Sequence, residues 1–169
     1  MWPGRSIWKP PGDYRDRSTR NVEVRETLDG CTDAIEAPVD CLFCRVNDSS
    51  VNTIFLESSK FYVRLDNFPA TKGHVEIVPK EHVVSLFDLS ATDIAEAYDL
   101  MRAAQEKLKQ EYNPDGFTIG INDGHAAGRT IDHLHIHLIP RYYGDVADPR
   151  GGIRQIVPNF NPSLWSPVK

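Results

Sequence analysis

The feature that most constrains this chain is a run of three histidines spaced two residues apart, His133, His135 and His137. In a β-strand, side chains at positions i, i+2 and i+4 project from one face, about 6.7 Å apart at each step. We therefore predict a half-buried strand within residues 129–140, with the three imidazoles on one face and the apolar side chains in a core. The apolar residues that alternate with the histidines are Leu134, Ile136 and Leu138.

A row of three imidazoles favours a chemical role over a purely structural one. Protonated neighbours would repel each other, so their proximity should lower the pKa of at least one ring. Three uses are open: nucleophilic catalysis by a neutral ring nitrogen, a three-histidine metal site, or proton shuttling. A strand that merely carries histidines on its exposed face is the remaining alternative, and the bounding residues Gly128, Thr130 and Pro140 argue against it.

Size and composition exclude several classes of protein. A chain of 169 residues, 40% hydrophobic and 25% charged, is typical of one soluble domain with its own core. The net charge of −5 argues against a general nucleic-acid binder. We expect no membrane span and no secretory signal, because long apolar runs are missing and the first thirty residues are charged. Three cysteines do not make a disulfide framework, so we expect a reducing cytoplasm.

We divide the chain into three parts. Residues 1–38 are predicted to be a partly irregular extension, because prolines and charges interrupt any periodicity. Its apolar residues could dock on the domain or on a partner subunit, or the segment could be a mobile tail, and residues 22–25 could add an edge strand. Residues 39–144 hold the organised domain, and residues 145–169 form a C-terminal segment. The docking candidates are Trp2, Ile7 and Trp8.

The remaining pattern predicts an α+β fold built on an antiparallel sheet with one long helix. Ser90 begins the helix, with Asp93 completing a capping box, and residues 113–116 end it. An apolar stripe at helical spacing is expected to face the core: Ile94, Ala97, Tyr98, Met101, Ala104 and Leu108. Besides the histidine segment, strands are predicted at residues 53–56, 61–65, 74–78 and 117–121, with a further short one at 153–157.

The histidine segment resembles the signature of the histidine-triad (HIT) superfamily, in which histidines alternate with hydrophobic residues. The resemblance covers residues 39–144 and implies a HIT-like fold: a five-stranded antiparallel sheet with one long helix and a short helix. Several spacings support it. Asp66 stands eight residues before His74, Asn122 stands eleven before His133, and Pro79 to His82, Gly128 and Thr130 also fit.

The resemblance implies a nucleotidyl hydrolase or transferase that cleaves at the α-phosphate of dinucleoside polyphosphates or nucleoside phosphoramidates. His135 is the implied nucleophile and would form a nucleotidyl-histidine that water hydrolyses. His137 would donate a hydrogen bond to a phosphoryl or bridging oxygen. Arg129 stands where many members have glutamine, which leaves the leaving-group preference open, and His74 is expected to be structural. The implied nucleotide-binding residues are Asp66, Asn122, Gly128, Arg129 and Thr130.

The spacing of Cys41 and Cys44 indicates a zinc site. Resemblance to the zinc-binding branch adds His82 and His133, which would complete a closed tetrahedral set. Such a zinc is structural, and it argues against a catalytic metal on three histidines because His133 is already used. Two buried cysteines without a metal are the alternative.

The resemblance also implies a homodimer acting on a small nucleotide, without an organic cofactor and without nucleic-acid or membrane partners. Two other functions stay open: a non-catalytic nucleotide-binding regulatory module, and a metal-dependent hydrolase that uses the triad as its ligands. The physiological substrate and the acceptor, water or phosphate, are not indicated by the sequence.

Overall fold

The computed structural model describes residues 41–156. All of them belong to one compact unit. The predicted extension 1–38, with its docking residues and its edge strand at 22–25, lies outside the described residues. The boundaries proposed near residues 39 and 145 therefore stay predictions.

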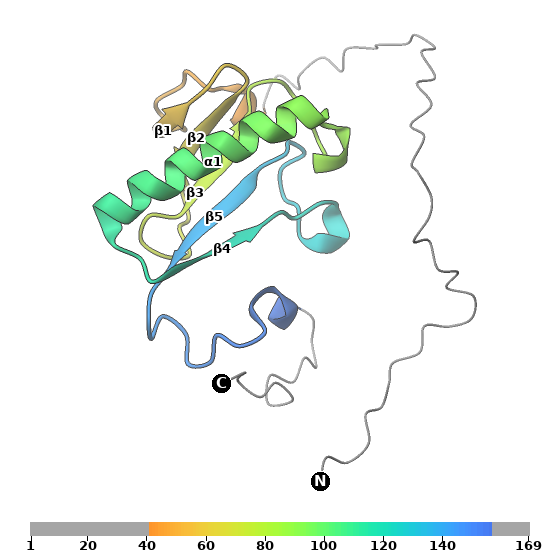
Figure 1. Cartoon of the computed structure of the whole chain (residues 1–169). Helices are drawn as coiled ribbons and strands as arrows, with labels where there is room; N and C mark the ends of the chain where they lie inside the picture. The colour runs from red at the N-terminus through yellow and green to blue at the C-terminus, as the bar shows by residue number, and fades with distance from the viewer. Residues whose placement is uncertain (1–40, 157–169) are drawn as a thin grey trace, which may run out of the picture. The chain divides into compact units, whose positions relative to one another are not determined.

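Five strands form one antiparallel sheet in the order β1-β2-β3-β5-β4 (Figure 1). The first three follow one another along the chain, and β5 returns between β3 and β4. The predicted α+β fold, with a five-stranded antiparallel sheet and one long helix, is confirmed, and four predicted strands agree with the structure to within one residue. The strands are β1 Ile54–Glu57, β2 Phe61–Leu65, β3 Val75–Pro79, β4 Gly116–Gly120 and β5 Ile136–Arg141.

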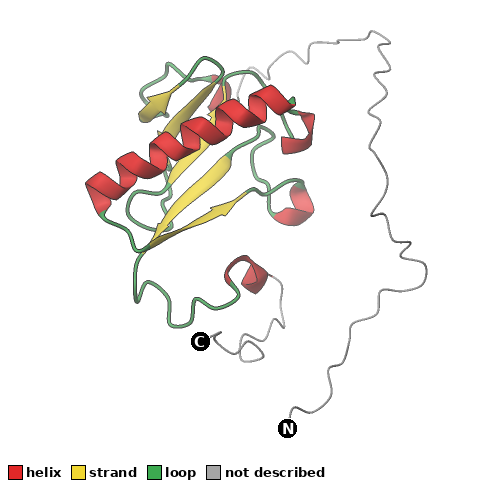
Figure 2. Cartoon of the chain, in the orientation of Figure 1, coloured by secondary structure: helices red, strands yellow, loops and turns green. Residues whose placement is uncertain are grey.

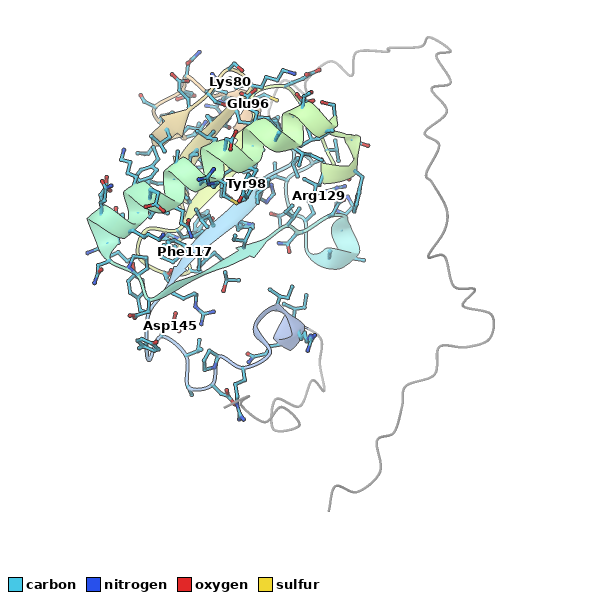
Figure 3. The ribbon with its side chains drawn as sticks, in the orientation of Figure 1. Lys80, Glu96, Tyr98, Phe117, Arg129 and Asp145 are labelled. Carbon is cyan, nitrogen blue, oxygen red and sulfur yellow. The ribbon has the colours of Figure 1, made fainter. Side chains whose placement is uncertain are left out.

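The long helix α1, Ala91–Tyr112, crosses one face of the sheet (Figure 2). The predicted capping box is present, since Ser90 accepts the Asp93 amide and Asp93 accepts the Ser90 amide. Glu96, which projects from α1 (Figure 3), also accepts hydrogen bonds from the turn between β1 and β2, including one of 2.7 Å from the Lys60 amide. No helix among the described residues is long and apolar enough to cross a membrane. The described residues also contain four short 3-10 helices: η1 Leu42–Cys44, η2 Leu86–Asp88, η3 His125–Ala127 and η4 Gly152–Ile156.

The core lies between α1 and the sheet. Its centre is made by alternate residues of β2, β3 and β5 and by one stripe of α1: Phe61, Val63, Val75, Ile77, Ala97, Leu100, Ala104, Leu108, Ile136 and Leu138. The predicted helix stripe is wrong at Ile94 and Tyr98, which are 45% and 55% exposed. At 100° per residue these two side chains lie to one flank of the buried stripe, and Leu100 is buried instead.

Two features of the C-terminal half differ from the prediction. Residues 152–156 form the 3-10 helix η4 in place of the expected strand at 153–157, because Gly151 and Gly152 turn the chain with φ of 86° and 48°. The histidine strand also starts later than predicted. β5 begins at Ile136, so His133 and His135 precede it and only His137 lies within it.

Candidate active site and metal centre

A cavity of about 390 Å³ opens on the face of the sheet opposite α1. His135 and His137 reach it from β5 and the segment just before it. The turn after β2 and the loop between β4 and β5 supply the other predicted residues, so six of the seven predicted catalytic and nucleotide-binding residues line one cavity. These six are Asp66, Asn122, Gly128, Thr130, His135 and His137.

His135 is held in one tautomer. Its Nδ1 lies 2.8 Å from the carbonyl oxygen of His133 and must donate to it, which leaves the lone pair on Nε2. The ring is 7% exposed and packs against Phe43, with ring centroids 5.0 Å apart. Burial lowers the pKa of His135, so the ring is neutral at physiological pH. A neutral imidazole with a free Nε2 is a competent nucleophile.

His137 is held in the opposite tautomer by a chain of hydrogen bonds. The Ala70 amide donates to Nδ1 of His74 at 3.2 Å, so the His74 proton sits on Nε2. His74 Nε2 then donates to His137 Nδ1 at 3.0 Å, which leaves the His137 proton on Nε2. Burial, followed by the neighbouring His135 and His74, lowers the pKa of His137 to about 4. His74, which was expected to be structural, thus orients a second imidazole, and a β-strand pattern does not reveal this contact.

Asp66 is fixed at the rim of the cavity by its own turn. Its Oδ1 accepts the Phe68 amide at 2.6 Å, and its Oδ2 lies 3.5 Å from His74 Nδ1 and 3.9 Å from His137 Nδ1. Arg129 is the predicted residue that does not line the cavity. Its guanidinium lies 3.0 Å from Asp132 and 3.6 Å from Asp123, so its role in nucleotide binding stays a prediction (Figure 3).

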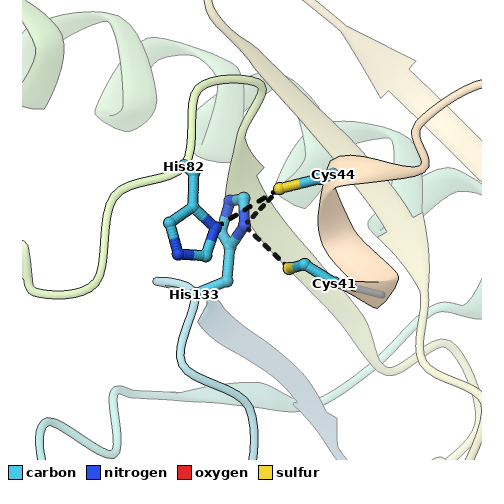
Figure 4. A group of neighbouring side chains, drawn as sticks. All are labelled: Cys41, Cys44, His82 and His133. Carbon is cyan, nitrogen blue, oxygen red and sulfur yellow. Dashed lines mark hydrogen bonds between the residues drawn. The ribbon is translucent and has the colours of Figure 1, made fainter. Parts of the chain in front are cut away.

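The four predicted metal ligands come together beside the cavity (Figure 4). Cys41 and Cys44 belong to η1 and its start, while His82 follows β3 and His133 precedes β5. Their ligand atoms all lie within 4.8 Å of one another. The Cys44 sulfur lies 3.3 Å from His82 Nδ1 and 3.5 Å from His133 Nδ1, and the Cys41 sulfur lies 3.4 Å from His133 Nδ1. A tetrahedral zinc with ordinary bond lengths separates sulfur from nitrogen by about 3.6 Å, so this set fits zinc.

The second nitrogen of His133 supports this use of the ring. Its Nε2 lies 2.9 Å from the Pro79 carbonyl and donates to it, which turns the Nδ1 lone pair toward the two sulfurs. Burial lowers the pKa of His133 to about 4 and, with Cys41, raises the pKa of Cys44 to about 11. A bound cation would favour the thiolates. The predicted row of three imidazoles on one face is therefore wrong: His133 precedes β5 and faces the cysteines, and only His135 and His137 face the cavity.

Comparison with known proteins decides the family. The HIT domain model matches residues 47–144, more than half of the chain. The chain belongs to the HIT domain family. Among its relatives, the adenosine 5'-monophosphoramidase hnt1 of Schizosaccharomyces pombe is 29% identical over 104 residues, which are 61% of this HIT chain and 75% of the relative. The asymmetrical bis(5'-nucleosyl)-tetraphosphatase of the same yeast is 32% identical over 80 residues, 47% of this chain and 44% of that protein.

Solved structures of HIT proteins share this fold. A zinc-bound histidine triad family protein from Mycobacterium smegmatis superposes with a TM-score of 0.59 at 32% identity, over 64% of this chain and 80% of that one. The likeness supports the assignment of the sheet and α1, and it shows that a HIT protein can carry zinc.

Proposed function

We propose that this HIT protein is a nucleotide hydrolase or nucleotidyl transferase that cleaves at the α-phosphate of adenosine derivatives, either dinucleoside polyphosphates or nucleoside phosphoramidates. The observation that carries the proposal is the pair of imidazoles in the cavity. His135 has a free Nε2 lone pair, and its neighbour His137, with ring centroids 5.0 Å apart, has a proton on Nε2. The names of the phosphoramidase and tetraphosphatase relatives agree with such chemistry.

The reaction has two displacements at phosphorus. Nε2 of His135 attacks the α-phosphorus, the bond to the leaving group breaks, and the leaving group departs with the electron pair. Water then attacks the nucleotidyl-histidine and the P–N bond breaks to return neutral His135. Over the cycle one oxygen–hydrogen unit of the water stays on phosphorus, and its other proton passes through solvent to the leaving group. The N–H of His137 donates a hydrogen bond to a phosphoryl or bridging oxygen, where negative charge grows in the transition state. Such a donor contributes about 3 kcal/mol to transition-state stabilisation.

The rest of the cavity would orient the nucleotide. The Asp66 carboxylate, held by the Phe68 amide, is an acceptor for two ribose hydroxyls. Asn122 and Thr130 line the same cavity and would offer side-chain hydrogen bonds to phosphate. Gly128, with φ of 93°, lets the backbone between them adopt a conformation that other residues rarely reach.

We further propose that zinc is bound by Cys41, Cys44, His82 and His133. The fit of the donor set and the zinc-bound relative support this proposal. With four protein ligands the site is closed, so zinc would be structural and would tie η1 to the segments that flank β3 and β5. The protein's own imidazoles perform the chemistry. Thiols of this kind need a reducing compartment, which favours the cytoplasm.

A homodimer is part of the proposal. β4 is an edge strand of the sheet, and Ile119 on it is 49% exposed. Ile94 and Tyr98 add exposed apolar surface on α1. Exposed strand edges and apolar patches are typical of surfaces that pair with another subunit.

The deciding experiment is to trap the intermediate. Brief incubation with a dinucleoside polyphosphate labelled in the α-phosphate should leave labelled nucleotide on His135, located by peptide mass analysis. His135→Asn should lose the label and at least about a thousandfold in kcat. His125→Asn is the matched control, because His125 lies in the neighbouring loop with its side chain 75% exposed. Unchanged turnover in His135→Asn would overturn the proposal.

The same assay separates the two rival functions. A regulatory binding module would bind nucleotide tightly and turn over no adenylyl compound. A metal-dependent hydrolase would lose all activity on chelation and regain it with added metal. Full activity in protein that chelation has freed of metal would exclude this second rival.

A further inference from the structure

A second cavity lies on the same face of the sheet as the proposed active site. It has a volume of about 240 Å³. On β5, Ile139 and Arg141 follow His137 at every second position, so their side chains share its face of the strand. We call this space the side cavity, and its lining includes Thr71, Thr118, Ile139, Arg141, Asp145 and Val146.

Two elements run from the active-site cavity into the side cavity. Along β5, His137 lines the first cavity and Ile139 lines the second. In the turn after β2, Asp66 lines the first cavity, whereas Ala70, whose amide donates to His74, lines the second. The two cavities are therefore neighbours, with the His137 ring at their border.

Position 120 leaves this border open on the β4 side. Gly120 pairs with His137 across the two strands, so a side chain at position 120 would stand on the same face, about 5 Å from that of His137. A Cβ added to Gly120 would meet no atom within 4 Å outside its chain neighbours. A substrate group can therefore pass beside His137 from one cavity into the other.

The proposed reaction directs the leaving group toward the side cavity. In an in-line displacement, the attacking and departing atoms lie on opposite sides of phosphorus. The attacking Nε2 belongs to His135, and the N–H that would serve the departing atom belongs to His137, two residues further along the chain. The group bonded to the departing atom would then lie beyond His137, where Ile139 begins the side cavity.

The polar side chains of the side cavity are occupied with one another. Asp145, in the segment after β5 (Figure 3), accepts two hydrogen bonds from Arg141, of 2.6 and 2.8 Å, so the pair carries no net charge. The Thr118 hydroxyl accepts a third hydrogen bond from the same guanidinium at 3.1 Å. Contact with a ligand is therefore left mainly to the apolar side chains, among them Ile139 and Val146.

The charges that line the two cavities oppose a polyphosphate. Arg64 donates to Glu76 at 2.6 Å and is only 2% exposed, so its charge is already used. Among the described residues, two arginines and three carboxyl groups line the two cavities, and Arg129 lines neither. A polyphosphate chain carries several negative charges and is bound in proteins by arginines and lysines that are free to pair with it.

We propose that the side cavity is the leaving-group subsite, and that it favours a small, uncharged, apolar leaving group, such as the alkylamine of a nucleoside phosphoramidate, over a dinucleoside polyphosphate. This inference rests on the function proposed above and chooses between its two substrate classes. At about 30 Å³ for each water-sized group, the side cavity holds about eight non-hydrogen atoms. A hexylamine fits this volume, whereas a second nucleoside does not.

The test is a series of adenosine 5'-phosphoramidates that carry methylamine, propylamine or hexylamine. Because each methylene that enters the side cavity leaves water, kcat/KM should rise about threefold per methylene. Diadenosine tetraphosphate should have a kcat/KM at least about tenfold below that of the hexyl compound. A kcat/KM that ignores chain length, or a preference for the tetraphosphate, would overturn the inference.

A variant at the border tests the route. Gly120→Val places a branched side chain beside His137, and valine suits a β-strand. The variant should lose at least about tenfold more kcat/KM on the hexyl compound than on the methyl compound, because only the longer amine must pass position 120. Equal losses on the two compounds would show that the amine leaves by another path.

A change of charge tests the same subsite in the opposite direction. Asp145→Asn leaves Arg141 without its carboxylate, so the side cavity gains a positive charge. The kcat/KM for diadenosine tetraphosphate should rise about threefold, and that for the hexyl compound should not rise. Asp148→Asn is the matched control, because Asp148 pairs with Arg150 and lines neither cavity. An unchanged tetraphosphate activity in Asp145→Asn would contradict a leaving group in the side cavity.

Binding without turnover separates this inference from the proposed function. In His135→Asn, calorimetry should show at least about tenfold tighter binding of the hexyl than of the methyl compound, and adding Gly120→Val should remove the difference. If the wild type cleaves the series but neither rate nor affinity depends on chain length, the inference fails and the proposed function stands. If the wild type cleaves no adenylyl compound, the proposed function fails, and the side cavity loses its role as a leaving-group subsite.

Discussion

At the scale of single residues, the site depends on where two protons sit. His135 and His137 are both neutral imidazoles, yet one presents a lone pair and the other an N–H. The difference comes from main-chain groups: the His133 carbonyl accepts from one ring, and the Ala70 amide fixes the second through His74. Backbone geometry therefore gives two residues of the same type opposite tautomers, which under the proposed function suit one as nucleophile and the other as donor.

The first prediction concerns the Asp66 carboxylate. Asp66→Ala should raise KM for a ribonucleotide substrate by about 10- to 100-fold, the expected loss of hydrogen bonds to a charged acceptor. The 2',3'-dideoxy analogue lacks the hydroxyls, so its KM should change by less than about twofold. Steady-state kinetics on both substrates check this. Equal effects on the two would show that Asp66 only supports the turn that leads to Phe68.

The second prediction is a pH profile. The reactive form of His135 is neutral, and burial lowers its pKa below the ordinary value of 6.5. Activity on a nitrophenyl ester should therefore hold as pH falls from 8 toward neutrality, and the midpoint of its acidic decline should lie below pH 6.5. The measurement is kcat/KM against pH. A decline centred above pH 7 would contradict a buried, neutral nucleophile.

At the scale of the elements, two short segments meet at His133. Cys41 and Cys44, at the two ends of η1, lie against the segment before β5, and the His133 ring of that segment faces them. The pairing of β3 with β5 ends at Ile77 and Ile136. Beyond these residues the backbone ladder stops, and the Pro79 carbonyl accepts a hydrogen bond from the His133 ring. This side-chain hydrogen bond links the end of β3 to the segment before β5.

The third prediction tests these segments through the metal. The purified protein should contain one zinc per chain, and Cys44→Ser should abolish it and lower Tm by about 10 °C, as expected for a loss of a few kcal/mol in a domain of this size. Elemental analysis and calorimetry measure both quantities. The third cysteine, Cys31, lies outside the described residues, and Cys31→Ser should change neither. A zinc content unaffected by Cys44→Ser would place the metal elsewhere.

At the scale of the whole molecule, the sequence predicted the sheet and the long helix. It did not predict where β5 begins or which side chains meet across neighbouring strands. Alternation placed Leu134, Ile136 and Leu138 in the interior, where they are 2%, 7% and 1% exposed. It could not predict that β5 starts at Ile136, because the end of a strand depends on its partner. The ion pair between Arg64 and Glu76 was not predicted either. These residues are twelve positions apart and meet only through the register of β2 and β3.

The fourth prediction concerns assembly. If β4 and the exposed flank of α1 form a dimer interface, Ile119→Glu and Tyr98→Glu should each shift the protein toward monomer, because a buried charge opposes association. Sedimentation velocity measures the change. Tyr143→Glu, on a side chain that is 92% exposed and outside this surface, is the control. A wild type that sediments as a monomer at all concentrations would refute the predicted homodimer.

Residue 133 belongs to two sites at once. Its ring points to the sulfurs, and its carbonyl oxygen, a few bonds away, receives the proton of the neighbouring imidazole two positions on. A displacement of that one peptide unit would change both the contact with the cysteines and the hydrogen bond that fixes the His135 tautomer. If the proposed zinc site and the proposed nucleophile are correct, a substitution that shifts residue 133 should therefore affect metal binding and catalysis together.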